Sequence, residues 1–321
     1  MAHVVVTRPL IENGLNDLYG ENDVTVCDPP SGQARTEQEL IQLAAGADVL
    51  VTVVEDPVTH RVFEACPDLE MVAQYGVGLD NIDLESAQEH DVVVTHTPGV
   101  LTDATADFTW ALLLTVARHV RQADQFVRDG RFERWETTLL LGPGLSDKTM
   151  GIVGLGRIGA AVARRALGFG MNVIYHNRTR ANPTIERQAS ARYVDMDTLL
   201  STSDVVSLHC PLNEDSHHLI DASALEAMKK EAILVNTARG PIVDEAALVE
   251  ALQAGEIAGA GLDVFEKEPA LHPDLSDLDN VILAPHLASA TREARLKMAH
   301  MCVASIGALL GDAETIPHRV T

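Results

Sequence analysis

Short runs of β-branched and other apolar residues alternate with helical patterns along the whole chain. Strands that are separated by helices predict parallel β-sheets of the α/β class. Five expected strands occupy the first hundred residues: HVVVTR, DVTVCD, DVLVTVV, LEMVAQY and DVVVTH. Six more begin at residue 150: MGIVG, NVIYHN, VVSLHC, AILVNT, GAGLDV and NVILAP. We therefore expect two Rossmann-like, doubly wound parallel sheets, the second with six strands.

Two helical stretches determine the expected domain boundaries. The first, from about Leu101 to His119, separates the two series of strands and lies either in a core or at an interface. The second, TREARLKMAHMCVASIGALL, follows the last strand and has no strand of the second series left to join. We expect it to return to the first unit. Residues 1–99 and 288–321 then form a discontinuous domain, and residues 100–287 form the other.

Composition excludes several classes of protein. The formal net charge of −23 argues against a nucleic-acid partner, because phosphate binding needs clustered Lys and Arg. The start MAHVVVTRPL lacks the features of a secretory signal, and no apolar run reaches the roughly 18 residues of a membrane span. The four cysteines are scattered without any CxxC pair. We expect a cytoplasmic protein without a membrane partner, a disulfide framework or a metal site.

A glycine-rich turn joins the first strand of the second series to a helix in GIVGLGRIG, residues 151–159. Gly154 permits a tight turn, Gly156 lets the backbone approach a pyrophosphate, and Gly159 allows close packing of the helix. The free N–H groups of the helix N-terminus attract phosphate. In this strand–turn–helix context the motif predicts dinucleotide binding, against the alternative of a structural glycine turn. The expected cofactor residues are Gly154, Leu155, Gly156, Arg157, Ile158 and Gly159.

The next strand ends in YHNRTR, where dinucleotide-binding proteins usually carry an acid that holds the ribose 2′-hydroxyl. Here Asn177 is neutral and is followed by Arg178, Thr179 and Arg180. Arginine makes charge-assisted hydrogen bonds to a 2′-phosphate, whereas an acid would repel it. The segment predicts a preference for NADP, with NAD possible. The alternative is that both arginines are solvated loop residues.

Three further strand ends carry a basic, an acidic and an imidazole side chain: Arg239 in NTARGPIVDE, Glu268 in LDVFEKEP and His286 in APHLASAT. Together they suit reduction of a 2-oxo acid. A guanidinium binds carboxylate and carbonyl, an imidazolium donates a proton, and a carboxylate holds the imidazole. Because a carboxylate favours the protonated imidazole, reduction should fade in alkaline solution. Separately each residue is uninformative, since a lone His or Glu at such a place is more often structural.

In combination the motifs resemble those of the D-2-hydroxyacid dehydrogenases, NAD(P)-dependent enzymes, over essentially the whole chain. The motifs are GIVGLGRIG, HCPLNEDSHHLI, LVNTARGPIVDE, GLDVFEKEP and APHLASAT. The resemblance implies that Arg239 binds the substrate, that His286 is the proton donor and that Glu268 is its hydrogen-bonded partner. It also implies that the N–H groups of Val77 and Gly78 bind the substrate carboxylate. Further implied cofactor contacts are Thr105, Cys210, Pro211, Thr237, Ala238 and Asp263.

Within that family the segments THTPGVLTDATADFTWALLLTVAR and HNR are most similar to glyoxylate and hydroxypyruvate reductases. The resemblance thus implies NADPH-dependent formation of glycolate or D-glycerate, and a homodimer built through the cofactor domains. Ala288 departs from the family, since many relatives have glycine there. Two alternatives stay open: another acid such as phosphoglycerate, lactate or a longer 2-oxo acid, or a nucleotide-sensing protein like the co-repressors. His217 and His218 are expected to be solvated.

Overall fold

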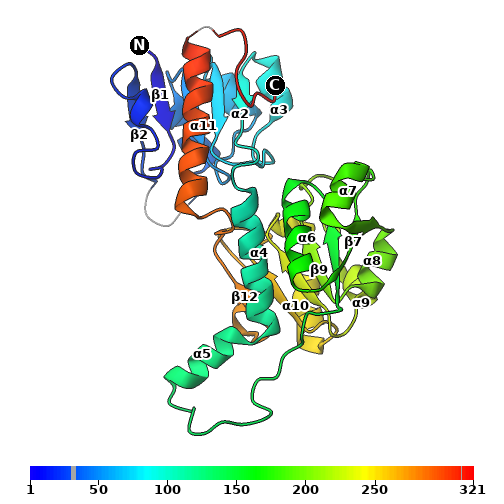
Figure 1. Cartoon of the computed structure of the whole chain (residues 1–321). Helices are drawn as coiled ribbons and strands as arrows, with labels where there is room; N and C mark the ends of the chain where they lie inside the picture. Colours follow the sequence, from blue (N-terminus) through cyan, green and yellow to red (C-terminus); the bar gives the residue numbers. More distant parts are fainter. Residues whose placement is uncertain (30–33, 312) are drawn as a thin grey trace. The chain divides into compact units, whose positions relative to one another are not determined.

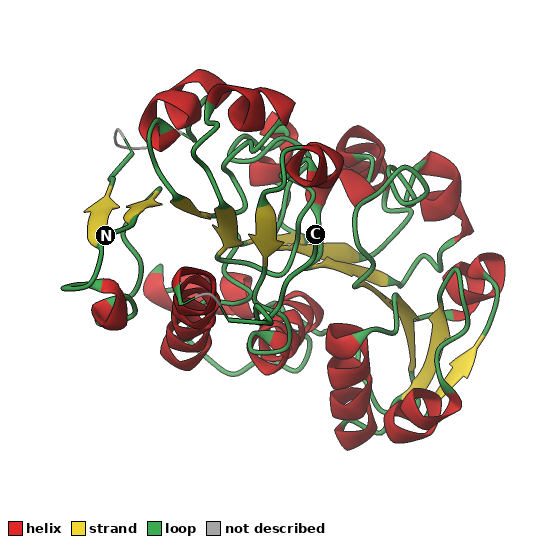
Figure 2. Cartoon of the chain, turned by 90° about the horizontal axis from the view of Figure 1, so that it is seen from above, coloured by secondary structure: helices red, strands yellow, loops and turns green. Residues whose placement is uncertain are grey.

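The computed structural model describes residues 1–29, 34–311 and 313–321. These residues form two compact units, Met1–Leu101 with Ala290–Thr321, and Thr102–Ser289. Each unit is built on one parallel β-sheet with helices packed against it (Figure 1, Figure 2). The expected fold class is therefore confirmed.

The first unit has five parallel strands in the order β2-β1-β3-β4-β5. Their bounds are β1 His3–Val6, β2 Asp23–Val26, β3 Val49–Thr52, β4 Met71–Gln74 and β5 Val93–Thr95. Its helices are α1 Glu37–Ala44, α2 His60–Ala65, α3 Leu84–Glu89 and α11 Arg292–Leu310, with the 3₁₀ turn η1 Asn16–Leu18. This strand order is one of the two common doubly wound arrangements.

The two faces of the first sheet are covered by different parts of the chain. Leu40 of α1 and Phe63 of α2 share a buried cluster with Leu50 of β3. Since alternate residues of a strand point to the same face, this cluster belongs to one face of the sheet. The last helix, α11, packs against β4 with side chains outside that cluster. Cys302 of α11, for example, directs its thiol to the Gln74 carbonyl of β4. The helix therefore packs on the first sheet.

The second unit has seven parallel strands in the order β12-β11-β10-β9-β6-β7-β8. They are β6 Thr149–Val153, β7 Asn172–His176, β8 Ala191–Tyr193, β9 Val205–Leu208, β10 Ile233–Asn236, β11 Gly259–Leu262 and β12 Val281–Leu283. The helices are α4 Thr102–Ala117, α5 Val120–Arg128, α6 Arg157–Gly168, α7 Pro183–Ala189, α8 Met196–Thr202, α9 Ala222–Ala227 and α10 Glu245–Ala254. Two 3₁₀ turns, η2 Gly240–Ile242 and η3 Pro273–Asp277, follow β10 and β11.

The second sheet buries a hydrophobic cluster on each face. Ile233 and Val235 of β10 belong to the cluster with α4 and α6, whereas Leu234 between them belongs to the cluster with α8, α9 and α10. A strand covered on both faces needs a nearly continuous apolar sequence. This requirement explains why β10, with its apolar run ILV, and the strands beside it could be predicted from the sequence.

One strand of this sheet was not expected. β8 is only ARY, and it pairs with β7 from Val173↔Ala191 to Tyr175↔Tyr193 at the sheet edge. Six strands were predicted and seven are present. The segment was missed because an edge strand is buried less completely, and its central residue, Arg192, is exposed and charged.

An extended arm leads from α4 to β6. α5 and the segment after it extend away from the rest of the second unit (Figure 1). α5 has no buried residue, and Val127, Phe132, Trp135 and Leu141 are exposed, Trp135 to 78%. Separately, among the described helices none is long and apolar enough to cross a membrane.

Candidate active site

Arg239, Glu268 and His286 follow the three adjacent strands β10, β11 and β12. Because the strands are parallel, all three residues lie beyond the same, carboxyl edge of the sheet, where α/β proteins bind ligands. The Nδ1 atom of His286 lies 2.8 Å from Oε2 of Glu268. The other carboxylate oxygen of Glu268 accepts a hydrogen bond from Phe265 N at 3.0 Å. This arrangement fixes the imidazole of His286 through its Nδ1 atom.

The backbone around His286 is fixed by Asp263. The N–H of His286 donates to the Asp263 carbonyl at 2.8 Å, and His286 has a φ of 53°. Both carboxylate oxygens of Asp263 accept backbone N–H groups, from Leu287 and Ala288, each at 2.7 Å. Burial raises the pKa of Asp263, which has no exposed surface. Ala288 does not adopt a positive φ, so its methyl group needs no strained backbone there.

The Arg239 segment is in backbone contact with the loop that carries Glu268. A Cβ built on Gly240 would lie 1.8 Å from the carbonyl oxygen of Phe265, so only glycine fits. Asn236 fixes the turn before it: its Nδ2 donates to the Arg239 carbonyl at 2.8 Å, and its Oδ1 accepts from Ala238 N at 3.0 Å. A guanidinium N–H of Arg239 also donates to the Ala238 carbonyl at 2.8 Å.

The glycine turn has the shape that a dinucleotide requires. Gly154 has a φ of 99°, and a Cβ there would lie 2.5 Å from Cys210 N. A Cβ on Gly159 would lie 2.2 Å from the Gly154 carbonyl oxygen, so the helix can approach only without a side chain. Around Gly156, by contrast, a Cβ would meet nothing within 4 Å. The open backbone at Gly156, at the N-cap of α6, suits a pyrophosphate.

Several other expected cofactor residues have defined partners in the second unit. Oδ1 of Asn177 accepts from Leu155 N at 2.6 Å, which ties the end of β7 to the turn. Burial raises the pKa of Cys210 to about 11, so its thiol is neutral near pH 7. Pro211, the next residue, accepts a hydrogen bond from Ser216 at 2.7 Å. The Thr109 hydroxyl donates a hydrogen bond to the Thr105 carbonyl at 2.8 Å. It also lies at hydrogen-bond distance, 2.9 Å, from the hydroxyl of Thr237.

The two arginines after Asn177 have different partners. Arg180 makes two hydrogen bonds to Glu186, at 2.7 and 3.0 Å, and Tyr175 donates to the same carboxylate. The bonds from Arg180 and Tyr175 lower the pKa of Glu186 to about 2. Arg178 instead pairs with Asp215 at 2.6 Å, and the two side chains are 78% and 70% exposed. Such an exposed pair is weak. The partner of Arg180, Glu186, is by contrast only 12% exposed. Thr179 between them is exposed.

Val77 and Gly78 follow β4 in the first unit. The Val77 carbonyl lies 3.0 Å from Nδ1 of His96, and the Gly78 carbonyl accepts from Nε2 of Gln74 at 3.2 Å. The loop is therefore held through its carbonyl groups. Its part in substrate binding stays a prediction.

The expectation that His218 is solvated was wrong. Its side chain is 33% exposed. Its backbone N–H donates to the Pro241 carbonyl at 2.8 Å. Nε2 lies 3.4 Å from Oε1 of Glu266 without being aligned for a hydrogen bond. His217 is exposed and lies against it, with ring centroids 4.1 Å apart. No signal in the sequence distinguishes the two histidines, because the partners of His218 are distant in the chain.

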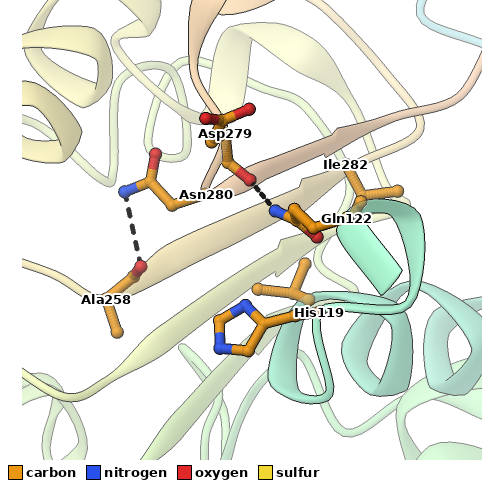
Figure 3. A pocket seen from close by; sticks show the side chains of 7 residues that line it. His119, Gln122, Ala258, Asp279, Asn280 and Ile282 are labelled. Carbon is orange, nitrogen blue, oxygen red and sulfur yellow. Dashed lines mark hydrogen bonds between the residues drawn. The ribbon is translucent and has the colours of Figure 1, made fainter. Parts of the chain in front are cut away.

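A small pocket occupies the opposite edge of the second sheet. Figure 3 shows its lining residues between the end of α4, the start of α5 and the amino ends of β11 and β12. They are Val116, His119, Gln122, Ala258, Asp279, Asn280 and Ile282. The pocket is thus separate from the residues that follow the carboxyl ends of the strands. In the part of the chain that the structure describes, no group of His, Cys, Asp and Glu residues could hold a metal ion.

The chain is similar to known proteins in sequence and in fold. Residues 110–288 match the family model described as D-isomer specific 2-hydroxyacid dehydrogenase, NAD binding domain. The chain is 49% identical over 302 residues to the glyoxylate reductase of Thermococcus litoralis, covering 93% of this chain and 90% of that protein. A crystal structure of a Thermus thermophilus protein has a TM-score of 0.92 and 44% identity, covering 99% of this chain and 100% of that one. An NADPH-dependent glyoxylate/hydroxypyruvate reductase from Sinorhizobium meliloti, in complex with NADP and malonate, has a TM-score of 0.87 and 33% identity, covering 100% and 97%.

Proposed function

The chain belongs to the D-isomer specific 2-hydroxyacid dehydrogenases, and we propose that it reduces glyoxylate, hydroxypyruvate or both, with a preference for NADPH. As a member it is an NAD(P)-dependent dehydrogenase acting on a small 2-oxo acid. The observation that carries the proposal is the pair of Glu268 and His286, 2.8 Å apart, beyond the same sheet edge as Arg239.

His286 is the proton donor in this proposal. Its Nδ1 is engaged by Glu268, so Nε2 carries the proton that passes to the carbonyl oxygen of the substrate. The carboxylate of Glu268 stabilises the imidazolium before transfer and fixes the plane of the ring. The bound nicotinamide supplies the hydride that reduces the carbonyl carbon.

Arg239 binds the carboxylate and the carbonyl oxygen of the substrate in this proposal. A guanidinium donates several N–H bonds in a fixed plane, so it can orient a 2-oxo acid and offset the negative charge that develops on its oxygen. The N–H groups of Val77 and Gly78 bind the substrate carboxylate. Because the protein carries a net charge of −23, these local donors have to overcome a repulsive field.

Preference for NADPH is attributed to Arg178. Asn177 is neutral and already bonded to the glycine turn, so no carboxylate at that position repels a 2′-phosphate. The S. meliloti enzyme with NADP bound supports an NADP-dependent chemistry on this fold. The Thermococcus relative supports glyoxylate as the substrate.

A homodimer formed through the second unit is also proposed. The arm of residues 120–141 exposes the large apolar side chains of Val127, Phe132, Trp135 and Leu141. Monomeric proteins rarely leave such a group of large apolar side chains in water. Light scattering during gel filtration tests this proposal, which a monomeric mass at micromolar concentration would overturn.

Initial rates of NADPH and NADH oxidation with glyoxylate and with hydroxypyruvate test the enzymatic proposal. We expect saturating turnover with at least one of the two acids. We also expect kcat/KM for NADPH to exceed kcat/KM for NADH. Turnover that favours NADH would leave the reductase assignment and refute the role of Arg178. Turnover confined to pyruvate, phosphohydroxypyruvate or longer 2-oxo acids would refute the substrate assignment.

A further inference from the structure

Glu245, the first residue of α10, is a buried carboxylate to which the proposed mechanism gives no role. Only 9% of it is exposed. Burying a carboxylate is costly unless hydrogen bonds compensate it. Its position in the sequence, at the end of NTARGPIVDE, suggests only an acidic residue in the first turn of a helix.

Both carboxylate oxygens of Glu245 bind the loop that carries Glu268. Oε2 accepts from Glu266 N at 3.0 Å, and Oε1 accepts from His272 N. These two N–H groups lie on either side of Glu268 in the chain. In return Oε2 of Glu266 accepts from Glu245 N at 3.2 Å. Glu245 thus clamps the loop before and after the residue that holds His286.

His218 adds a second connection between the same segments. Its ring lies between two carboxylates, with Nε2 at 3.4 Å from Oε1 of Glu266 and Nδ1 at 3.9 Å from Oδ2 of Asp244. Its backbone N–H bonds to Pro241, two residues after Arg239. Asp244 meanwhile caps α10 by accepting from Ala247 N at 3.0 Å. The ring therefore lies between the Glu268 loop and the segment that follows Arg239.

We propose that Glu245, assisted by His218 and Glu266, is a positioning residue that holds Glu268 against His286 and in register with Arg239. The inference rests on the proposed function, because it assumes that Glu268 and His286 act in reduction. None of the three residues touches substrate in this proposal. We call Glu245, Glu266 and His218 the loop brace.

Glu245→Gln is the first test, because it keeps the size of the side chain and removes one acceptor. The amide oxygen can accept a hydrogen bond from one of the two backbone N–H groups, of Glu266 or His272. The NH₂ group then faces the other N–H group and cannot accept its hydrogen bond. Losing one charge-assisted hydrogen bond predicts a fall in kcat of about tenfold. The dissociation constant of NADPH should stay within about twofold, since the glycine turn follows another strand. Glu250→Gln, an exposed residue of the same helix, is the matched control and should match the wild type.

The pH profile separates a positioning role from a merely structural one. His286 is faced within its unit by the carboxylates of Glu268 and Asp263. If the brace keeps Glu268 in place, Glu245→Gln should move the alkaline fall of kcat/KM toward lower pH, in the direction that Glu268→Gln moves it. In the Glu268→Gln background the second substitution should have almost no further effect, because both act through the same carboxylate.

Folded Glu245→Gln protein with wild-type kcat and an unshifted pH profile would overturn the inference. If that variant does not fold, His218→Gln, at a half-buried position, carries the same test, with a smaller loss of about threefold. An unshifted profile there would also overturn it. The proposed function fails separately: His286→Gln with wild-type turnover refutes the proton donor, whereas inactive His286→Gln with an unshifted Glu245→Gln profile refutes the brace alone.

Discussion

The carboxyl ends of β11 and β12 and the carboxyl end of β7 belong to one sheet, yet they fix their functional side chains differently. Beyond β11 and β12, His286 and Glu268 are held by buried or half-buried groups, including both oxygens of Asp263. Beyond β7, Arg178 is held by a single exposed pair with Asp215. Hydrogen bonds to buried or half-buried groups thus hold the proposed proton donor in position. The proposed coenzyme preference depends instead on a surface contact that water and salt weaken.

The largest effect is expected for His286→Gln. Glutamine cannot donate a proton as an imidazolium does, so kcat should fall by about 10³-fold, within the range of general acid catalysis. Binding of NADPH, followed by fluorescence quenching, should change by less than about twofold. His300→Gln, an exposed residue of α11, is the control. A loss of NADPH affinity that matches the loss of kcat would contradict the separation of the two regions.

Glu268→Gln should have the second largest effect. It removes a charge-assisted hydrogen bond worth roughly 1.5–3 kcal/mol, so kcat/KM should fall by about tenfold to a hundredfold. The substitution also takes away the carboxylate that faces the imidazolium of His286. The alkaline limb of the kcat/KM profile for reduction should therefore move to lower pH. An alkaline limb at the wild-type position would show that Glu268 does not act on the donor.

Arg178→Ala should act on coenzyme choice alone. The dissociation constant for NADPH should rise by about tenfold, the lower end for a charge-assisted bond, because the side chain is exposed. That for NADH should not change. Arg180→Ala is the matched comparison and should affect NADPH less, since Glu186 already holds Arg180 through two hydrogen bonds. Equal effects of both substitutions on the dissociation constant for NADPH would refute the proposed difference between the two arginines.

The smallest effect is expected for Asp215→Asn. An exposed ion pair is worth about 0.2–1 kcal/mol, so releasing Arg178 from Asp215 should tighten NADPH binding by up to about fivefold. The gain should disappear in the Arg178→Ala background. It should also shrink at high ionic strength, because salt screens exposed charges. Titrations with NADPH at two salt concentrations, in the Asp215→Asn variant with and without Arg178→Ala, measure both effects. If NADPH still binds more tightly in the double variant than in Arg178→Ala alone, the gain does not come from releasing Arg178.

Local patterns in the sequence were sufficient for most strands and for the glycine turn. Buried parallel strands require continuous apolar runs, and a turn such as Gly154 requires glycine for steric reasons that act within a few residues. β8 lacked such a signal, because an edge strand tolerates Arg192. The pair of Glu268 and His286 was expected only through combination with Arg239 and the family resemblance.

Contacts between distant segments could not be predicted. No local pattern predicts that Arg178 pairs with Asp215 while Arg180 pairs with Glu186. The proposed role of Arg178 in coenzyme preference rests on this difference. The same holds for Glu245, whose carboxylate binds N–H groups more than twenty residues away in the chain, at Glu266 and His272. Such contacts depend on how loops meet after the sheet has formed.

The chain enters its second unit once, after Leu101, and leaves it once, at Ser289. During synthesis the second unit therefore leaves the ribosome as one uninterrupted segment and can complete its core while translation continues. The first sheet emerges earlier, but α11, the helix that covers one of its faces, is translated only after the second unit. A nascent chain thus carries an uncovered apolar sheet face for the whole time needed to make the second unit, roughly ten to forty seconds at ordinary elongation rates. The first sheet, which is made before the second unit, can thus be covered on this face only after the second unit has been made.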